Sequence, residues 1–439
     1  MRIPALLHQA NFRSFFLGQS ASMLGDQVSV LAIPLTAVLV LHAGPGQLGL
    51  LTAVSLLPSL LFSLLAGALI DRRGNRRQTM LVADWIRAAA MLSLPVAYSL
   101  DVLTLAQLYL VAFVVGTLDV AFFVSYNALI VALVEPGEYV EANALLNGSR
   151  SVAGVLGLTL GGSLVSLLSA PGALLVDAVS FAVSGLGIGR AKVTEPPPEF
   201  ASGSGIGAGA RYLAGSPVIR TMLLSTAWVN LFTFVGNAIL VLYATRTLHL
   251  GPGLIGLAFG ASAVGGVLGA LTATRLEGRI GLGPAFVVGS FLFPLPLLLV
   301  PLAHGPQTLA VALLLTSEFL SSLGVIWLDV TSGAIFAQLI PNGMRARVSG
   351  AYRTVNYGVR PVGALIGGGL GEAVGLRATM WVYAVGASCA GLPLLRRAIL
   401  ELRSAPRRQP AAEPAAKPTT GRTADPAPTT APNGAPRGG

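Results

Sequence analysis

The sequence predicts an all-α membrane protein with twelve transmembrane helices in two six-helix halves. The 439 residues are 54% hydrophobic and only 10% charged, whereas soluble chains carry about 25% charged residues. Apolar runs of about 20 residues recur along most of the chain, each long enough to cross about 30 Å of hydrocarbon. An internal repeat relates the two halves. The period-2 alternation of a membrane β-barrel is absent from the sequence.

Twelve apolar segments follow one another along the chain. We expect helices at 12–41, 47–70, 78–99, 103–133, 139–168, 171–189, 217–247, 252–276, 281–303, 306–339, 343–371 and 375–398. A polar connector rich in Pro, Gly and Ser covers 190–216 and divides the chain into halves at 1–189 and 217–400. Residues 401–439 hold few large apolar side chains, so they cannot bury a core and are expected to form a disordered cytoplasmic tail.

The basic residues gather in alternate loops. One set of loops contains most of the arginines and lysines, whereas the other contains little beyond Arg246 and Arg377. Because Lys and Arg concentrate on the cytoplasmic side of membrane proteins, we expect the first set of loops and both termini to be cytoplasmic. The localisation that follows is the bacterial inner membrane, crossed several times.

The repeat is visible in short matched segments. The run from Gly157 to Gly162 matches the run from Gly363 to Gly368, with a Gly-Gly pair at the end of each. Gly67-Ala-Leu likewise matches Gly269-Ala-Leu at nearly the same spacing. A duplicated six-helix unit built around a central site is a transporter architecture.

A charged loop joins the second and third expected helices. It combines a turn glycine, one aspartate and several arginines, and its notable residues are Gly67, Asp71, Arg72, Gly74, Arg76 and Arg77. The order Gly, Asp four residues later, then Arg-x-Gly and further basic residues resembles the loop signature of the major facilitator superfamily, with Asn75 where an arginine is usual. Near its start the chain contains Asn11-Phe12-Arg13, followed by Gly18-Gln19 and Gly25-Asp26. This start resembles the branch that includes macrolide-efflux and enterobactin-export proteins. The resemblance implies the major facilitator fold and a transport function.

In the matching loop of the second half, Ala273 stands opposite Asp71. We therefore expect only the first loop to act as a cytoplasmic gate, with Asp71 facing the positive end of the eleventh helix. Asp329, near the cytoplasmic end of the tenth helix, is expected to belong to the same gate.

The fifth helix contains a glycine series. Its members are Gly148, Gly157, Gly161 and Gly162. The series resembles the antiporter motif of the superfamily, with Leu158 in place of the usual proline. Small residues of this kind let two helix backbones approach closely in a membrane, so packing alone is the alternative interpretation.

Ionisable residues inside the spans are the candidates for chemistry, because each is costly unless it is paired or faces water. Gln19 and Asp26 share one face of the first helix, and Asp26 lies about 21 Å along it at 1.5 Å per residue. Asp119 and Glu318 lie inside the fourth and tenth helices. A carboxylate here can carry a proton or meet substrate charge; our order of preference is Asp26, Glu318, Asp119. The alternative is a fixed pair with an arginine of the fifth or eleventh helix.

Further polar groups lie on the fifth, seventh and eleventh helices. They are Arg150, Asn230, Asn237, Arg353, Asn356 and Arg360. The resemblance implies that helices 1, 4, 7 and 10 line a central cavity. Substrate contact in that cavity and structural pairing between helices remain open for the stripes on helices 5 and 11. Asp84 and Arg87, one helical turn apart, are expected to pair locally.

Other function classes find little support. The sequence has no phosphate loop, no clustered Cys or His and no His-x-x-x-His motif, so neither an enzyme nor a cofactor or metal site is expected. The net charge of +10 lies in loops and tail, which argues against nucleic-acid binding. We expect a monomeric exporter of a small amphipathic organic molecule driven by protons. A uniporter or importer of a polar metabolite is the alternative, and a membrane scaffold is a third hypothesis.

Overall fold

The computed structural model describes residues 4–135, 137–193, 206–396 and 400–402, without the side chains of 64–69, 71–73, 206–208, 210, 342 and 346. Every regular element in these residues is helical, and the predicted all-α membrane fold with twelve spans is confirmed. Most of the predicted tail lies outside the described residues.

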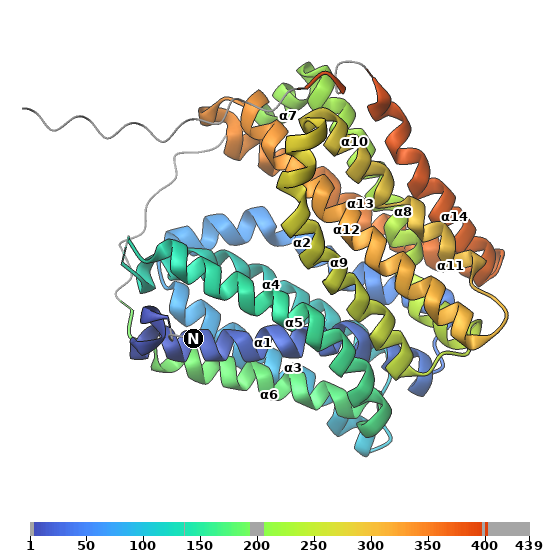
Figure 1. Ribbon diagram of the computed structural model, residues 1–439. Helices are drawn as coiled ribbons and strands as arrows, with labels where there is room; N and C mark the ends of the chain where they lie inside the picture. Colours follow the sequence, from blue (N-terminus) through green and yellow to red (C-terminus); the bar gives the residue numbers. More distant parts are fainter. Residues whose placement is uncertain (1–3, 136, 194–205, 397–399, 403–439) are drawn as a thin grey trace, which may run out of the picture. The chain divides into compact units, whose positions relative to one another are not determined.

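The helices follow the predicted order (Figure 1). Their bounds are α1 Ala10–Leu35, α2 Pro45–Arg73, α3 Arg76–Ser99, α4 Leu105–Leu133, α5 Tyr139–Leu168, α6 Ala170–Arg190, α7 Ile206–Gly215, α8 Pro217–Arg246, α9 Pro252–Ile280, α10 Leu282–Leu292, α11 Leu299–Leu302, α12 Gln307–Leu339, α13 Arg345–Ala373 and α14 Leu376–Ser388. The predicted ends differ from these by a few residues, as expected for helix boundaries.

Two of the predicted spans are interrupted. The ninth consists of α10, a 3₁₀ turn at Leu295–Leu298 and α11, because Pro294 and Pro296 remove backbone N–H donors from the helix. The twelfth continues from α14 as a 3₁₀ helix, Cys389–Leu395. The ninth span is therefore interrupted at these prolines.

Eleven described segments are long and apolar enough to cross a membrane. The span missing from this set is α13, whose 29 residues reach about 43 Å at 1.5 Å per residue. Its polar residues lower its hydropathy, and it packs between α2 and α8. Of its polar residues, Asn356 is buried and Arg360 is half-buried, whereas Arg353 is exposed.

The connector contains a helix that the sequence analysis did not predict. Helix α7 packs against α13, and the Tyr212 hydroxyl donates to the carbonyl of Leu339 at 2.7 Å. Leu213 of α7 joins a buried apolar cluster with Ile219 and Val348. The end of the connector is thus fixed to the C-terminal half.

The two halves meet mainly through two helix pairs, α2 with α13 and α5 with α9 (Figure 1). In the first pair, a Cβ on Gly49 would lie 2.8 Å from the Cα of Gly368. In the second, a Cβ on Gly162 would lie 2.8 Å from the Cα of Gly256. Both crossings therefore require glycine, and they sit at corresponding places in the repeat.

The α2 and α9 helices begin with the same sequence pattern. Gly-Pro-Gly-x-x-Gly-Leu occupies 44–50 and again 251–257. In each copy the proline is the first helical residue. An N–H at that position would have no hydrogen-bond partner within the helix, so proline is tolerated there. The last glycine of each copy is the one at the crossing. The duplication thus extends to the contacts that join the halves.

The bundle has two different ends. We call the end with the N-terminus and α7 the connector end, and the end with loops 41–44 and 247–251 the far end. The largest buried apolar cluster takes residues from both halves near the far end, among them Leu35, Leu48, Tyr243 and Ile255. Towards the connector end, buried clusters belong to one half at a time. The described side chains thus join the halves at the far end.

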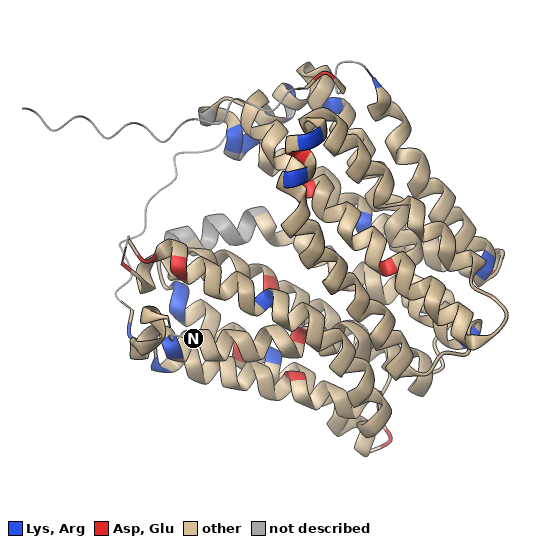
Figure 2. Ribbon diagram, viewed as in Figure 1, with Lys and Arg blue, Asp and Glu red and all other residues tan. Residues whose placement is uncertain are grey.

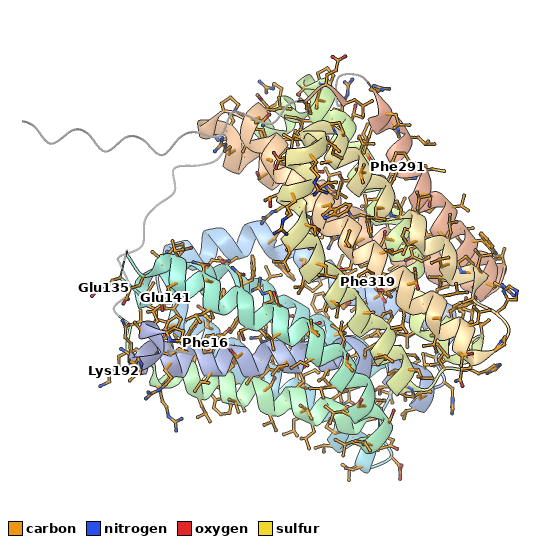
Figure 3. The ribbon with its side chains drawn as sticks, in the orientation of Figure 1. Phe16, Glu135, Glu141, Lys192, Phe291 and Phe319 are labelled. Carbon is orange, nitrogen blue, oxygen red and sulfur yellow. The ribbon has the colours of Figure 1, made fainter. Side chains whose placement is uncertain are left out.

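Charged residues are sparse along the spans and more frequent near the helix ends (Figure 2). Figure 3 labels Glu135, Glu141 and Lys192 at the connector end of the N-terminal half. There the side chain of Asn11 donates to the Lys192 carbonyl at 3.1 Å and accepts from the Lys192 N–H at 3.2 Å. These bonds fix the start of α1 to the end of α6.

Candidate transport cavity

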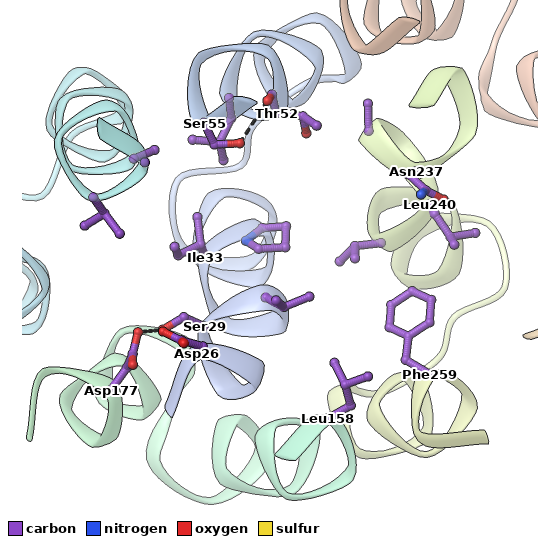
Figure 4. A pocket seen from close by; sticks show the side chains of 18 of the residues that line it. Asp26, Ser29, Ile33, Thr52, Ser55, Leu158, Asp177, Asn237, Leu240 and Phe259 are labelled. Atoms are coloured by element: carbon purple, nitrogen blue, oxygen red, sulfur yellow. Dashed lines mark hydrogen bonds between the residues drawn. The ribbon is translucent and has the colours of Figure 1, made fainter. Parts of the chain in front are cut away.

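A cavity of about 670 Å³ lies among helices of both halves. Most of its lining is apolar, including Ile33, Leu158 and Phe259 (Figure 4). Its charged lining residues are all acidic: Asp26, Asp119, Asp177 and Glu318. The cavity thus combines apolar walls with carboxylates, which suits amphipathic molecules.

Four polar residues singled out in the sequence line this cavity. Asp26 on α1, Asp119 on α4, Asn237 on α8 and Glu318 on α12 all contribute to its wall. These helices are the first, fourth, seventh and tenth spans. Helices α2, α5, α6 and α9 also contribute lining residues, so the cavity has more walls than the resemblance implied.

A smaller cavity of about 270 Å³ lies on the connector side of the first, within the N-terminal half. Its polar lining residues are Gln19, Ser22, Asp26, Gln27, Arg87, Asp119, Tyr126 and Arg150. Asp26 and Asp119 line both cavities. These two carboxylates therefore stand at the boundary between the spaces.

Arg87 on α3 is the centre of a buried charge cluster. Its guanidinium donates to Asp84 and, at 2.5 Å, to Asp119. The same group lies 4.3 Å from the ring centroid of Phe122 and 4.4 Å from that of Phe181. The predicted Asp84–Arg87 pair is present. Asp119 also pairs with Arg87 on α3, whereas the sequence analysis considered an arginine of the fifth or eleventh helix as its partner. A desolvated cation over one aromatic face is stabilised by about 2 kcal/mol.

Asp26 and Glu318 differ from Asp119 in having no hydrogen-bond or ion-pair partner among the described residues. Glu318 is the one carboxylate that the described C-terminal half supplies to the larger cavity. An unpaired carboxylate in a membrane span favours protonation or a bound cation. Both residues stay candidates for proton or substrate contact.

Asp177 on α6 is a cavity residue that the sequence analysis missed. Its carboxylate accepts hydrogen bonds from Ser29 and, at 3.1 Å, from Ser180. The signal was available, because Asp177 is the only charged residue between Ala170 and Gly189. The resemblance implied cavity walls from helices 1, 4, 7 and 10 alone, so it gave no reason to place Asp177 there.

The polar stripe on α13 pairs with α8. Arg360 donates through Nε to the Asn230 side chain at 3.0 Å, and Asn230 donates to Asn356 at 3.4 Å. The Arg360 guanidinium also lies 4.2 Å from the ring centroid of Tyr357. None of these residues lines either cavity. In this conformation the observed contacts are structural pairs within the C-terminal half.

Three other predicted residues occupy exposed positions. Arg150 lines the smaller cavity, and Arg353 has no hydrogen-bond or ion-pair partner among the described residues. Asp329 is exposed on α12 and experiences the charge of Arg360. Arg345, at the start of α13, donates to the carbonyls of Ala337 and Ile340 at the end of α12.

The structure describes only part of the charged loop between α2 and α3. Helix α2 continues to Arg73 and stops at Gly74, whose φ of 69° is the left-handed conformation that ends many helices. Arg77 donates to the carbonyls of Ile188 and Gly189 at 3.1 and 2.6 Å, so it caps α6 in the same half. Arg76 is half-buried. The side chains of Gly67, Asp71 and Arg72 lie outside the described residues, so the cross-half gate stays a prediction.

The glycines of α5 allow close contact with two neighbouring helices, α1 and α9. Gly157 and Gly161 face α1, where added Cβ atoms would lie 2.5 Å from the Gln27 side chain and 3.1 Å from the Val28 Cα. Gly162 faces α9 at the crossing already described, whereas Gly148 has nothing within 4 Å of its added Cβ. The expected close packing therefore applies to the last three glycines.

Comparison with protein families now decides the class. A family model described as "Transmembrane secretion effector" (MFS_3) matches residues 4–420. The chain belongs to this family of the major facilitator superfamily. It is consequently a transporter and not an enzyme, and a multi-pass protein of the bacterial membrane.

Similar proteins agree with this assignment. The chain is 27% identical over 414 residues to the multidrug efflux pump Tap of Mycobacterium tuberculosis, covering 87% of this chain and 92% of that protein. It is 26% identical over 404 residues to the enterobactin exporter EntS of Citrobacter koseri, covering 89% and 92%. The resemblance to the efflux and enterobactin-export branch is confirmed.

Solved structures share the fold. A bacterial homologue of the iron transporter ferroportin in an inward-facing state matches with a TM-score of 0.71 at 19% identity, over 89% of this chain and 99% of that one. The nucleoside transporter NupG matches with a TM-score of 0.68 at 12% identity, over 91% and 100%. At these identities the likeness concerns the fold alone.

Proposed function

We propose that this transporter exports a small amphipathic organic molecule, such as a drug, antibiotic or siderophore-like metabolite, in exchange for protons. The observation that carries the proposal is the 670 Å³ cavity, whose apolar walls hold unpaired carboxylates from both halves. The printed names of similar proteins, a multidrug efflux pump and an enterobactin exporter, point in the same direction.

Proton exchange follows from the position of Asp26. Its carboxyl group borders both cavities and has no partner among the described residues. An isolated carboxylate is expensive in a medium of low dielectric constant, so it must bind either a proton or a cationic group. If a substrate cation and a proton compete for this group, export of one is coupled to entry of the other.

Alternating access supplies the directional step. The buried cluster shared by both halves lies near the far end, which makes that end the closed one. We propose that the connector end is cytoplasmic, because the basic loops lie there. Residues 1–189 and 217–400 would rock against each other as a monomer, with 190–216 as the cytoplasmic connector.

Everted membrane vesicles with an imposed pH gradient test this function. Ethidium serves as a cationic amphipathic probe, and the gradient is followed with a pH-sensitive dye. We expect ethidium to enter the vesicles and partly dissipate the gradient, and Asp26→Asn to abolish both effects. Glu135→Gln, an exposed loop change, is the matched control and should behave as the wild type.

Two results would contradict the proposal. Ethidium transport that continues unchanged after the gradient is collapsed would indicate a uniporter. No movement of ethidium or of other amphipathic dyes, by protein shown to be inserted, would argue against export of this substrate class.

A further inference from the structure

Asp177 is an acidic residue in a helix that lies behind α1. It is only 1% exposed, although its side chain reaches the wall of the larger cavity. Helix α6 packs mainly against α1 and α3. A carboxyl group placed there can respond to movement between α1 and α6 without meeting the substrate directly.

The contact between α1 and α6 leaves room for this carboxyl group. Gly25 of α1 lies opposite it, and a Cβ added at Gly25 would collide with Ser180 and with the Asp177 carboxylate. Ser29, one turn further along α1, donates to one carboxylate oxygen, and Ser180 donates to the other (Figure 4 shows the first bond). The side chain is therefore enclosed by neutral hydroxyl groups.

The charged groups around Asp177 do not neutralise its negative charge. Helix α1 contributes Asp26, α3 contributes Asp84 and Arg87, and α4 contributes Asp119. Fully ionised, these four carboxylates and one guanidinium give a net charge of 1 − 4 = −3. Arg87 is already hydrogen-bonded to Asp84 and Asp119. Asp26 and Asp177 are thus the two members with no ion-pair partner in the described residues.

Asp26 and Asp177 differ in their accessibility from the cavities. Asp26 borders both cavities, whereas Asp177 is enclosed by Ser29 and Ser180 and is nearly inaccessible. A substrate cation can approach Asp26, but Asp177 presents almost no exposed surface to it.

We propose that Asp177 binds a proton that is transported in each cycle, at a site separate from the Asp26 carboxylate that meets the substrate. The proposal rests on the proton exchange argued above. When the Asp177 carboxyl group is protonated, its O–H donates to a serine hydroxyl. When the proton leaves to water in the cavity, the serine hydroxyl turns and donates to the carboxylate.

Ser29 fits this role because a hydroxyl group can both donate and accept. It lines the larger cavity and also contacts Asp177, so it stands between the site and the cavity. Movement of α1 along α6 would withdraw Ser29 and open the Asp177 carboxyl group to water. Proton release would then be tied to the same movement that changes access to the cavity.

Infrared difference spectroscopy on the purified full-length protein tests the site without any substrate. A pH titration of the wild type should show a protonated carboxyl C=O band that is absent in Asp177→Asn and present in the Glu135→Gln control. Ser29→Ala should keep the band but change its frequency, because one hydrogen bond is lost. A wild-type titration that Asp177→Asn leaves unchanged overturns the proposal.

Transport of ethidium in proteoliposomes separates coupling from substrate handling. Asp177→Asn should exchange ethidium across the membrane within about twofold of the wild type, but its accumulation should lose about tenfold for each unit of pH difference, the contribution of one proton. Asp26→Asn should lose exchange as well. If a single proton site serves both roles, the two variants behave alike, and the proposal fails.

The outcomes distinguish this proposal from the proposed function. A wild type with no response to the pH gradient contradicts proton exchange itself. A coupled wild type with an equally coupled Asp177→Asn contradicts only the role of Asp177. Should Asp177→Asn fail to fold, Ser29→Ala and Ser180→Ala decide instead, because both keep the carboxyl group, and unaltered coupling together with an unaltered band in both overturns the proposal.

Discussion

The carboxylate of Glu372 on α13 accepts a hydrogen bond from the backbone N–H of Gly46, 3.1 Å away, at the start of α2. The bond links the two halves at the far end, and it places a negative charge at the positive end of a helix. Nearby, Arg246 of α8 donates to the carbonyls of His42 and Ala43 at 3.2 and 3.0 Å. Two charged residues of the C-terminal half thus hold the loop between α1 and α2.

We expect Glu372→Gln to weaken closure of the far end. A carboxylate at a helix N-terminus stabilises by about 0.5–1 kcal/mol, so the open population should rise about two- to fivefold. The measurement is the labelling rate of Asn237→Cys, in a Cys389→Ser background, by a membrane-impermeant maleimide added from the far side. An unchanged rate would show that other contacts dominate closure. Asp101→Asn, in an exposed far-end loop, is the control.

Gly162→Leu should prevent the close crossing of α5 and α9. A side chain there would meet backbone atoms of Pro252 and Gly256, and overpacking typically costs about 1–3 kcal/mol. We expect a lower melting temperature of the purified protein and loss of ethidium transport. Gly148→Ala, where the added methyl group meets open space, should leave both quantities unchanged; equal damage by both variants would contradict the packing argument.

Arg87→Met should destabilise the N-terminal half. It would leave Asp84, which is fully buried, without its cation, and breaking a buried pair costs about 3–5 kcal/mol. Arg87→Met combined with Asp84→Asn should recover part of the loss, because the uncompensated charge is removed. Melting temperatures of the three proteins give the comparison, with the exposed Arg353→Gln as control. No recovery in the double variant would contradict the charge argument.

Glu318→Gln should reduce affinity for organic cations while preserving proton coupling. Glu318 has no partner in the described residues and faces the larger cavity. Loss of one charge contact of about 1.4 kcal/mol would raise the KM for ethidium about tenfold. Concentration-dependent uptake into everted vesicles measures this effect. Loss of the response to the pH gradient, with KM unchanged, would instead assign Glu318 to the proton pathway.

Asp71→Asn should impair transport and leave membrane insertion intact. The prediction comes from the charged loop, in which Asp71 is expected to face the start of the eleventh helix across the two halves. Uptake of ethidium and the amount of protein in the membrane fraction are measured together. Normal transport by Asp71→Asn would remove this residue from the cytoplasmic gate, and reduced insertion would make its role structural.

Much of the fold could be predicted from the sequence because the membrane constrains it strongly. Each span must satisfy its own backbone hydrogen bonds and match the thickness of the hydrocarbon, so helix α5 was predicted at 139–168, as observed. The repeated glycines also marked the crossings, since only small residues allow such close approach. Helix α7 was missed because it is only ten residues long and three of them are glycine, a poor helix former.

The candidate site was predicted less completely. Position inside a span, together with the resemblance, identified Asp26, Asp119 and Glu318 as candidates that face a cavity. It does not show which residue of another helix lies opposite. Asp119 was considered as a partner for arginines of the fifth or eleventh helix, yet it pairs with Arg87 on α3. Asp177 and Ser29, 148 positions apart in the chain, could not be connected by spacing alone.

The sequence by itself thus determined the membrane class, the span order and the duplication, because these follow from composition, apolar runs and matched segments. The tertiary structure alone decided the pairing of Arg87, the enclosure of Asp177 and the joining of the halves by Gly46 and Glu372. These depend on where helices distant in the chain cross, and contacts between helices are set by the packing of the whole bundle.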